Sequence, residues 1–161
     1  MDTPLNNLSY RVGDALNQQN LTLVTAESCT GGWISQVVTH TAGSSAWFER
    51  GFVTYANDAK VEMLGVAPET IAEFGAVSLE TVAEMAAGAL VNSNAMISLA
   101  VSGVAGPSGG SPDKPVGTVC FAWCKLGDAP QTERHRFDGD REAIRYQAVV
   151  CALEGLLARL K

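Results

Sequence analysis

TAESCTGG, residues 25–32, joins a predicted strand to a predicted helix. The apolar run at 21–26 is typical of a buried strand, and residues 33–38 have the apolar spacing of a helix. At such a turn Ser28 can point its hydroxyl off the strand end, while the glycine pair lets a ligand approach backbone N–H groups at the helix N-terminus. Those amides could hold a phosphate or serve as an oxyanion hole. The alternative is an ordinary helix entry in which Ser28 or Thr30 is only an N-cap.

A second glycine-rich turn follows another predicted strand. Residues 95–101 form a continuous apolar run, as expected of a strand buried on both faces, and the turn SGVAGPSGG begins there with Ser102 and Gly103. In open α/β sheets, ligands bind outside the carboxyl ends of the strands. Both glycine-rich turns are predicted to lie at such ends, which favours a functional role for Ser28.

The rest of the chain alternates between helical and strand patterns. Strands are expected at 21–26, 47–55, 95–101, 116–124 and 131–137, and helices at 5–19, 31–39, 59–64, from 68, at 78–91 and from about 141. Helices interspersed among strands predict an α/β domain with three layers, α/β/α. No internal repeat or linker is evident, so we expect a single domain over residues 1–161.

Composition limits the classes of function. The chain has 47% hydrophobic and 17% charged residues and a formal net charge of −6. It has no cluster of Lys and Arg, so we expect no nucleic-acid partner. The N-terminal residues lack the pattern of a signal peptide, and no apolar stretch is long enough to span a bilayer, so we expect a cytoplasmic protein with no membrane partner. Four cysteines without a Cys-x-x-Cys pair and only two histidines predict free thiols, no metal and no cofactor.

A serine nucleophile needs a base, and few residues of this chain could serve. Histidine is the usual base, but His40 is interpreted as a helix C-cap and His135 as part of an exposed charged strand. Lysine is the next candidate when its pKa is lowered. Lys60 falls in the first turn of a predicted helix, where the macrodipole disfavours a cation and lowers the pKa. Tyr55, at the end of the preceding strand, could orient Lys60 or relay a proton; the alternatives are a surface lysine and a core tyrosine.

Other reactive side chains lie near the two turns. Cys29 is the rival nucleophile, because a thiol at a helix N-terminus has a lowered pKa. Glu27 could act as a base or accept a hydrogen bond from an amide. Lys114 and Arg141 could hold an anionic group of a substrate, and the alternative for each is a surface ion pair. The first turn contains neither Gly-x-Ser-x-Gly nor Ser-x-x-Lys, so the general hydrolase motifs do not cover it.

Five blocks of the sequence, taken in order, resemble the bacterial CinA C-terminal domain family. They are TAESCTGG at 25–32, FVTY at 52–55 with Lys60, SGVAGP at 102–107 with the glycine pair 109–110, KPVGTV at 114–119, and GDR at 139–141. The resemblance covers nearly the whole chain. Within the family it is strongest to the stand-alone nicotinamide-nucleotide amidohydrolases.

The resemblance implies an activity, a fold and a set of site residues. The implied reaction is hydrolysis of the carboxamide of nicotinamide mononucleotide to nicotinic acid mononucleotide and ammonia, in pyridine-nucleotide recycling. The implied fold is a three-layer α/β/α sandwich around a mixed, mostly parallel sheet of about five strands, assembled as a homodimer. The implied catalytic residues are Ser28 as nucleophile, Lys60 as base and Tyr55 as an assisting residue. The residues expected to contact the substrate are Glu27, Thr30, Gly31, Gly32, Ser102, Gly103 and Arg141, the last three at the ribose phosphate.

Two alternatives stay open on the sequence alone. Cys29 could be the nucleophile of a thiol amidase. The domain could also be a non-catalytic nucleotide-binding or regulatory module, because a fold does not by itself confer a function.

Overall fold

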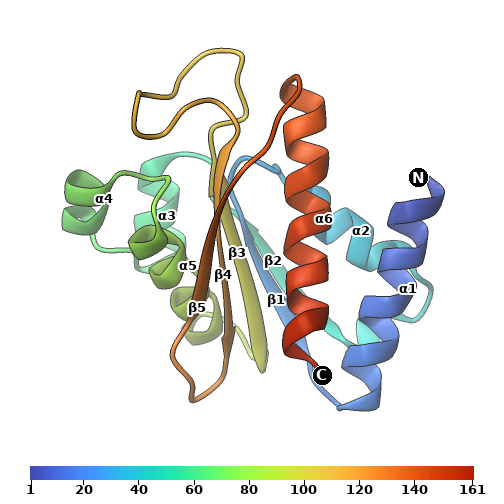
Figure 1. Cartoon of the computed structure of the whole chain (residues 1–161). Coiled ribbons are helices and arrows are strands. Elements are labelled where there is room, and N and C mark those ends of the chain that lie inside the picture. The colour runs from blue at the N-terminus through green and yellow to red at the C-terminus, as the bar shows by residue number, and fades with distance from the viewer.

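Five strands form one sheet in the computed structural model, which describes all 161 residues (Figure 1). In chain order they are β1 (Leu23–Glu27), β2 (Phe48–Val53), β3 (Ile97–Gly103), β4 (Thr118–Lys125) and β5 (Gln131–Arg136). Their spatial order is β2-β1-β3-β4-β5; β1 pairs in parallel with β2 and β3, and the β3–β4 and β4–β5 pairings are antiparallel. The predicted mixed five-stranded sheet is confirmed, with as many parallel as antiparallel pairings.

Helices cover both faces of this sheet, as Figure 1 shows. On one face lie α1 (Thr3–Gln18), α2 (Trp33–His40) and α6 (Arg141–Arg159), and on the other lie α3 (Asn57–Leu64), α4 (Pro68–Phe74) and α5 (Leu79–Val91). A short 3₁₀ turn, Ser44–Ala46, leads into β2. The α/β/α layering expected from the alternation of elements is confirmed.

Two apolar cores result, one on each face of the sheet. The larger contains 23 buried residues and packs α1, α2 and α6 on the sheet, and the smaller contains 14 and packs mainly α5. Neighbouring residues of β1 serve different cores, since Leu23 belongs to the larger and Val24 to the smaller. All five residues of β1 are buried, including the polar Thr25 and Glu27, because helices cover both faces of the sheet.

Backbone conformation sets where two of the helices begin. Gly31 and Gly32 have φ values of +60° and +99°, a left-handed conformation that keeps them outside the helix. Helix α2 therefore begins at Trp33, two residues later than expected. Helix α3 begins at Asn57, two residues earlier than expected, after an extended Ala56.

The strand register brings the functional turns together at one edge of the sheet. Glu27, the last residue of β1, pairs with Val53 of β2 and with Val101 of β3. The segments that follow these three strands therefore leave the sheet side by side, as the sequence analysis expected for the two glycine-rich turns. None of the helices combines the length and the apolar character needed to cross a membrane.

Candidate active site

A serine and a lysine meet at the carboxyl edge of the sheet. Ser28 directly follows β1, and its backbone N–H donates to the carbonyl oxygen of Val101 at 3.1 Å. Lys60, in the first turns of α3, reaches across so that its Nζ lies 3.0 Å from Ser28 Oγ. The two residues are 32 positions apart in the chain. The structure thus brings together Ser28 and Lys60, the two residues expected from the sequence to act as nucleophile and base.

The environment of Lys60 favours a neutral amine. The side chain is only 1% exposed, and its hydrogen-bond acceptors besides Ser28 are the carbonyl oxygens of Thr54 (2.8 Å) and Tyr55 (3.2 Å). No carboxylate forms a hydrogen bond or an ion pair with it. Burial therefore lowers the pKa of Lys60 below its usual value, because a buried ammonium loses its hydration. This is the direction required of a general base.

The carboxylate of Glu27 stabilises the turn that follows Ser28 and the start of α2 through hydrogen bonds. This fully buried carboxylate accepts hydrogen bonds from the Thr30 hydroxyl (2.6 Å), the backbone N–H groups of Ile34 (2.9 Å) and Ser35 (3.0 Å), and the Ser35 hydroxyl (2.7 Å). Gly32, at the N-cap position of α2, has no side chain to accept these N–H groups, so Glu27 takes that part from the preceding strand. Glu27 therefore holds the turn by its own side chain, and it is not among the residues that line the cavity above Ser28.

Free amide N–H groups lie next to Ser28 in the same turn. The N–H of Gly31 donates to the carbonyl oxygen of Ser28 at 3.0 Å, but the N–H groups of Cys29, Thr30 and Gly32 have no hydrogen-bond partner in the chain. The free N–H groups of Cys29 and Thr30 are adjacent in the chain and directly follow Ser28. Two such donors beside a serine nucleophile can form an oxyanion hole.

Helix α6 reaches the site with two arginines. Arg141 donates to the carbonyl oxygen of Gly106 at 2.7 Å and to the hydroxyl of Tyr55 at 3.1 Å. Tyr55 is 60% exposed and contributes its carbonyl oxygen, not its hydroxyl, to Lys60. One helical turn further on, Arg145 donates to the carbonyl oxygens of Cys29 and Thr30. These lie in the turn of residues 28–32, called the nucleophile turn below after the expected role of Ser28. Arg145 belongs to none of the motifs, and its sequence context is that of an ordinary arginine on a helix surface.

A cavity of about 330 Å³ opens above the serine–lysine pair. Six of the ten residues expected at the site line it: Ser28, Tyr55, Lys60, Ser102, Gly103 and Arg141. The other four, Glu27, Thr30, Gly31 and Gly32, are not part of its lining. Three lining residues that the sequence analysis did not expect are Asn57, at the start of α3, and Ala76 and Val77, in the connection between α4 and α5. This connection has no reactive side chain that could have revealed it.

Cys29 also lines the cavity but is poorly prepared as a nucleophile. The side chain is 5% exposed, and burial raises the pKa of the thiol to about 12, although nearby Arg145 acts in the opposite direction. At neutral pH the thiol is therefore protonated. This finding corrects the expectation of a lowered pKa, because burial outweighs the position next to a helix start.

Lys114 lies outside this cavity. Its Nζ donates to the carbonyl oxygen of Phe74 at the end of α4, so it fastens the second glycine-rich loop to the α4–α5 connection. A neighbouring cavity is lined by Lys114 together with Glu73, Glu80 and Arg134, a mixture of both charges.

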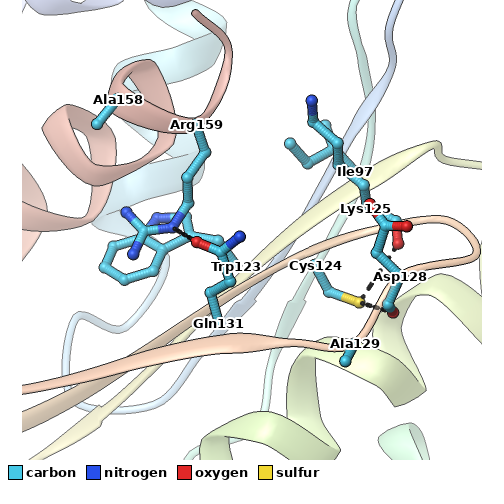
Figure 2. Close-up of a pocket in the computed structure, with 9 residues that line it drawn as sticks. All are labelled: Ile97, Trp123, Cys124, Lys125, Asp128, Ala129, Gln131, Ala158 and Arg159. Atoms are coloured by element: carbon cyan, nitrogen blue, oxygen red, sulfur yellow. Dashed lines mark hydrogen bonds between the residues drawn. The ribbon is translucent and has the colours of Figure 1, made fainter.

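A further cavity, of about 270 Å³, lies at the opposite end of the sheet and of α6 (Figure 2). Arg159 lies over the Trp123 ring, 3.8 Å from its centroid, and donates to Oε1 of Gln131 at 3.0 Å. Lys125, the last residue of β4, and Asp128 and Ala129, between β4 and β5, also line it. No serine or threonine lines it. The hydrogen bond between a lysine amine and a serine hydroxyl is found only at Ser28.

On an α/β sheet, a serine hydroxyl paired with a buried lysine in an open cavity is the arrangement expected of a hydrolase with a serine nucleophile. The family model described as "CinA C-terminal domain" matches residues 5–160, and the chain belongs to this family. The nicotinamide-nucleotide amidohydrolase PncC of Escherichia coli K12 is 54% identical over 155 residues, which are 96% of this chain and 94% of that protein. The protein of the same name from Pseudomonas putida is 53% identical, with 96% of both chains covered. Among solved structures, the competence/damage inducible protein CihA from Agrobacterium tumefaciens superimposes with a TM-score of 0.96 at 45% identity, covering 100% of this chain and 98% of that one.

Proposed function

We propose that this protein is an amidohydrolase that converts nicotinamide mononucleotide and water to nicotinic acid mononucleotide and ammonia. The observation that carries the proposal is the 3.0 Å contact between Lys60 Nζ and Ser28 Oγ inside an open cavity. The substrate is taken from relatives that bear the name nicotinamide-nucleotide amidohydrolase and are 53–54% identical over nearly their whole length. The family resemblance of the sequence motifs points to the same reaction.

The first half of the reaction forms an acyl-enzyme. Neutral Lys60 accepts the proton of the Ser28 hydroxyl, and Ser28 Oγ attacks the carboxamide carbon. The π electrons of the carbonyl move to its oxygen, which becomes an oxyanion facing the free N–H groups of Cys29 and Thr30. Gly31 does not serve here, because its N–H is bound to the carbonyl oxygen of Ser28.

Collapse of this intermediate releases ammonia. The oxyanion reforms the carbonyl, the C–N bond breaks, and protonated Lys60 gives its proton to the leaving nitrogen. Lys60 then takes a proton from water, which attacks the carbonyl carbon of the Ser28 ester. The C–Oγ bond breaks, protonated Lys60 returns the proton to Ser28 Oγ, and the acid product leaves as its carboxylate. Tyr55 assists through its carbonyl oxygen, which orients the amine at 3.2 Å, while its hydroxyl is held by Arg141.

The cavity lining also suits an anionic group. Arg141 is the one arginine in the cavity lining, and Lys60 is the only other cationic residue there. A planar guanidinium can bind a phosphate with two parallel hydrogen bonds. We propose that the ribose phosphate binds to Arg141 together with the turn at Ser102 and Gly103, all of which line the cavity.

The test is ammonia release from nicotinamide mononucleotide by the wild-type, Ser28→Ala and Cys29→Ala proteins, with and without a chelator. We expect Ser28→Ala alone to abolish turnover, and the chelator to have no effect. Loss of turnover in Cys29→Ala with an active Ser28→Ala would identify a thiol amidase instead. A silent wild-type protein that still binds the nucleotide would identify a binding module.

We also propose that the protein is a homodimer. Strand β2 lies at the edge of the sheet, and next to the site it exposes Val53 (47%) and, just beyond its end, Tyr55 (60%). The unpaired backbone groups of an edge strand can pair with a second copy, and the exposed Val53 and Tyr55 would be covered by it. Light scattering coupled to size-exclusion chromatography tests this, and a monomer at micromolar concentration would contradict it.

A further inference from the structure

Arg145 directs its positive charge at two peptide groups of the nucleophile turn. Its Nε donates to the carbonyl oxygen of Cys29 at 2.9 Å, and its Nη2 donates to the carbonyl oxygen of Thr30 at 3.1 Å. The guanidinium also lies over the ring of Trp33, the first residue of α2, 5.5 Å from the centroid. Arg145 forms no ion pair with a carboxylate. Its hydrogen bonds to the protein are therefore made with this turn.

Both of these hydrogen bonds lead to a free N–H beside Ser28. The carbonyl of Cys29 belongs to the same peptide group as the N–H of Thr30, which has no partner. The carbonyl of Thr30 belongs to the same peptide group as the N–H of Gly31, which donates to the carbonyl oxygen of Ser28 at 3.0 Å. That carbonyl shares its peptide group with the N–H of Cys29, the second free donor.

A donor on a peptide carbonyl polarises the whole peptide group and strengthens its N–H as a donor. Two hydrogen-bond paths run from Arg145 to the free N–H groups. The first passes through one peptide group, that of Cys29 and Thr30, and ends at the N–H of Thr30. The second passes from the peptide group of Thr30 and Gly31 to that of Ser28 and Cys29, and ends at the N–H of Cys29. Arg145 thus holds these peptides in orientation and adds positive potential where the oxyanion would form, without touching the substrate.

We propose that Arg145 is a positioning residue that orients and polarises the oxyanion-binding N–H groups of Cys29 and Thr30. The inference rests on the proposed amide hydrolysis at Ser28. It assigns a separate part to each of the two arginines that α6 brings to the site, with Arg141 at the cavity wall and Arg145 behind the nucleophile turn.

Helix α6 contains its own control. Arg159, near its other end, also lies over a tryptophan, Trp123, and also donates to a backbone carbonyl, that of Gly155. Arg159 lies far from Ser28 at the opposite end of the helix. Replacing Arg159 removes its cation–π contact, this backbone hydrogen bond, the hydrogen bond to Gln131 and the ion pair with Glu133. Its structural cost should therefore be at least as large as that of replacing Arg145, which loses a cation–π contact and two backbone hydrogen bonds. Only Arg145 has a route to the site.

The experiment compares wild type, Arg145→Met, Arg145→Lys and Arg159→Met in ammonia release from nicotinamide mononucleotide. Loss of a direct oxyanion donor lowers kcat about 100- to 1000-fold in other enzymes, so weakening two donors is expected to lower kcat about 10- to 100-fold in Arg145→Met. KM should change less than about threefold, because the ground-state carbonyl uses these donors little. Arg145→Lys, with the charge but without the planar fork, should lie between, and Arg159→Met should keep the wild-type kcat.

Two ligands provide a readout that a purely structural role would not move. A nucleotide with a formyl group in place of the carboxamide adds Ser28 Oγ to its carbonyl carbon, the serine proton passes to Lys60, and the adduct carries the oxyanion. The pyridinium mononucleotide without any carbonyl substituent probes the rest of the cavity. Arg145→Met should weaken binding of the formyl nucleotide about tenfold or more and leave the pyridinium nucleotide within about twofold.

Three results would overturn the inference. One is an active wild type with unchanged kcat in Arg145→Met, or in Arg145→Lys should Arg145→Met fail to fold. The second is an equal loss of affinity for both nucleotides, and the third is an equal loss of kcat in Arg159→Met. A wild-type protein that releases no ammonia would overturn the proposed function together with this inference.

Discussion

Replacing Lys60 with methionine tests whether the buried amine serves catalysis at the expense of stability. Methionine has nearly the length of lysine, so the space filled by the side chain is conserved. The change removes the 3.0 Å contact with Ser28 Oγ and the hydrogen bonds to the carbonyl oxygens of Thr54 and Tyr55. It also removes the cost of burying an ammonium group.

These effects have different sizes for activity and for folding. A general base contributes about 10²- to 10⁴-fold, and here the same amine also protonates the leaving ammonia. We therefore expect kcat to fall about 10³- to 10⁴-fold, or about 4–5.5 kcal/mol in the barrier. For folding, three lost hydrogen bonds cost about 1 kcal/mol each, and relief of a buried charge returns several kcal/mol. The free energy of unfolding at pH 7 should thus change by less than about 2 kcal/mol.

The pH dependence of stability gives an independent check. Because burial lowers the pKa of Lys60 in the folded state, the unfolded chain binds more protons between that pKa and the usual value of 10.5. The free energy of unfolding of the wild type should therefore rise with pH in this window, and Lys60→Met should lose this part of the rise.

The assays are coupled detection of ammonia and urea denaturation at several pH values. Lys125→Met serves as the matched control, because Lys125 lies at the end of β4, at the opposite end of the sheet from the site. Its activity and its pH slope should match those of the wild type. Retention of more than about a tenth of wild-type kcat in Lys60→Met, or a loss of activity explained by unfolding, would refute the assignment of Lys60 as base.

Further expectations concern other parts of the molecule. Ammonia release should increase with pH through the lowered pKa of Lys60, since only the neutral amine accepts the Ser28 proton; a pH-independent rate would argue against it. Iodoacetamide at pH 8 should leave Cys29 unmodified in peptide mass spectra, because its thiol pKa is raised to about 12. Glu27→Gln should lower the free energy of unfolding by about 2 kcal/mol in urea titrations, because an amide NH₂ would face N–H donors. In Gly88→Ala the new Cβ would lie 1.8 Å from the carbonyl oxygen of Leu64, and calorimetry should show a loss of about 2–3 kcal/mol.

Site residues could be predicted from the sequence when the local pattern and the chemistry of the side chain indicated the same role. An apolar run broken by small polar residues locates Ser28 at a strand end, and parallel pairing of β1 with β3 then brings the second glycine-rich turn beside it. Lys60 was detectable because a cation in the first turns of a helix is locally unfavourable. The structure adds that this side chain is buried and in contact with Ser28.

The remainder depends on side-chain direction, which local pattern does not contain. Glu27 alternates away from the cavity and caps α2, and this cannot be deduced from its neighbours in sequence. The hydroxyl of Tyr55 turns to Arg141 while its carbonyl oxygen faces Lys60. Arg145 contacts Cys29 across 116 residues, and no periodicity of α6 indicates which of its arginines points to the turn.

The long-range contacts of α6 also bear on the order in which the protein becomes active during synthesis. Ser28 and Lys60 lie in the first half of the chain and are 32 residues apart, so they leave the ribosome early. Arg141 reaches back 86 residues to Tyr55, and Glu154 reaches back 143 residues to Arg11 of the first helix. Contacts of such sequence separation form late and slowly. A nascent chain therefore carries its nucleophile and base for most of translation, and the turn around them is completed only when the last helix docks.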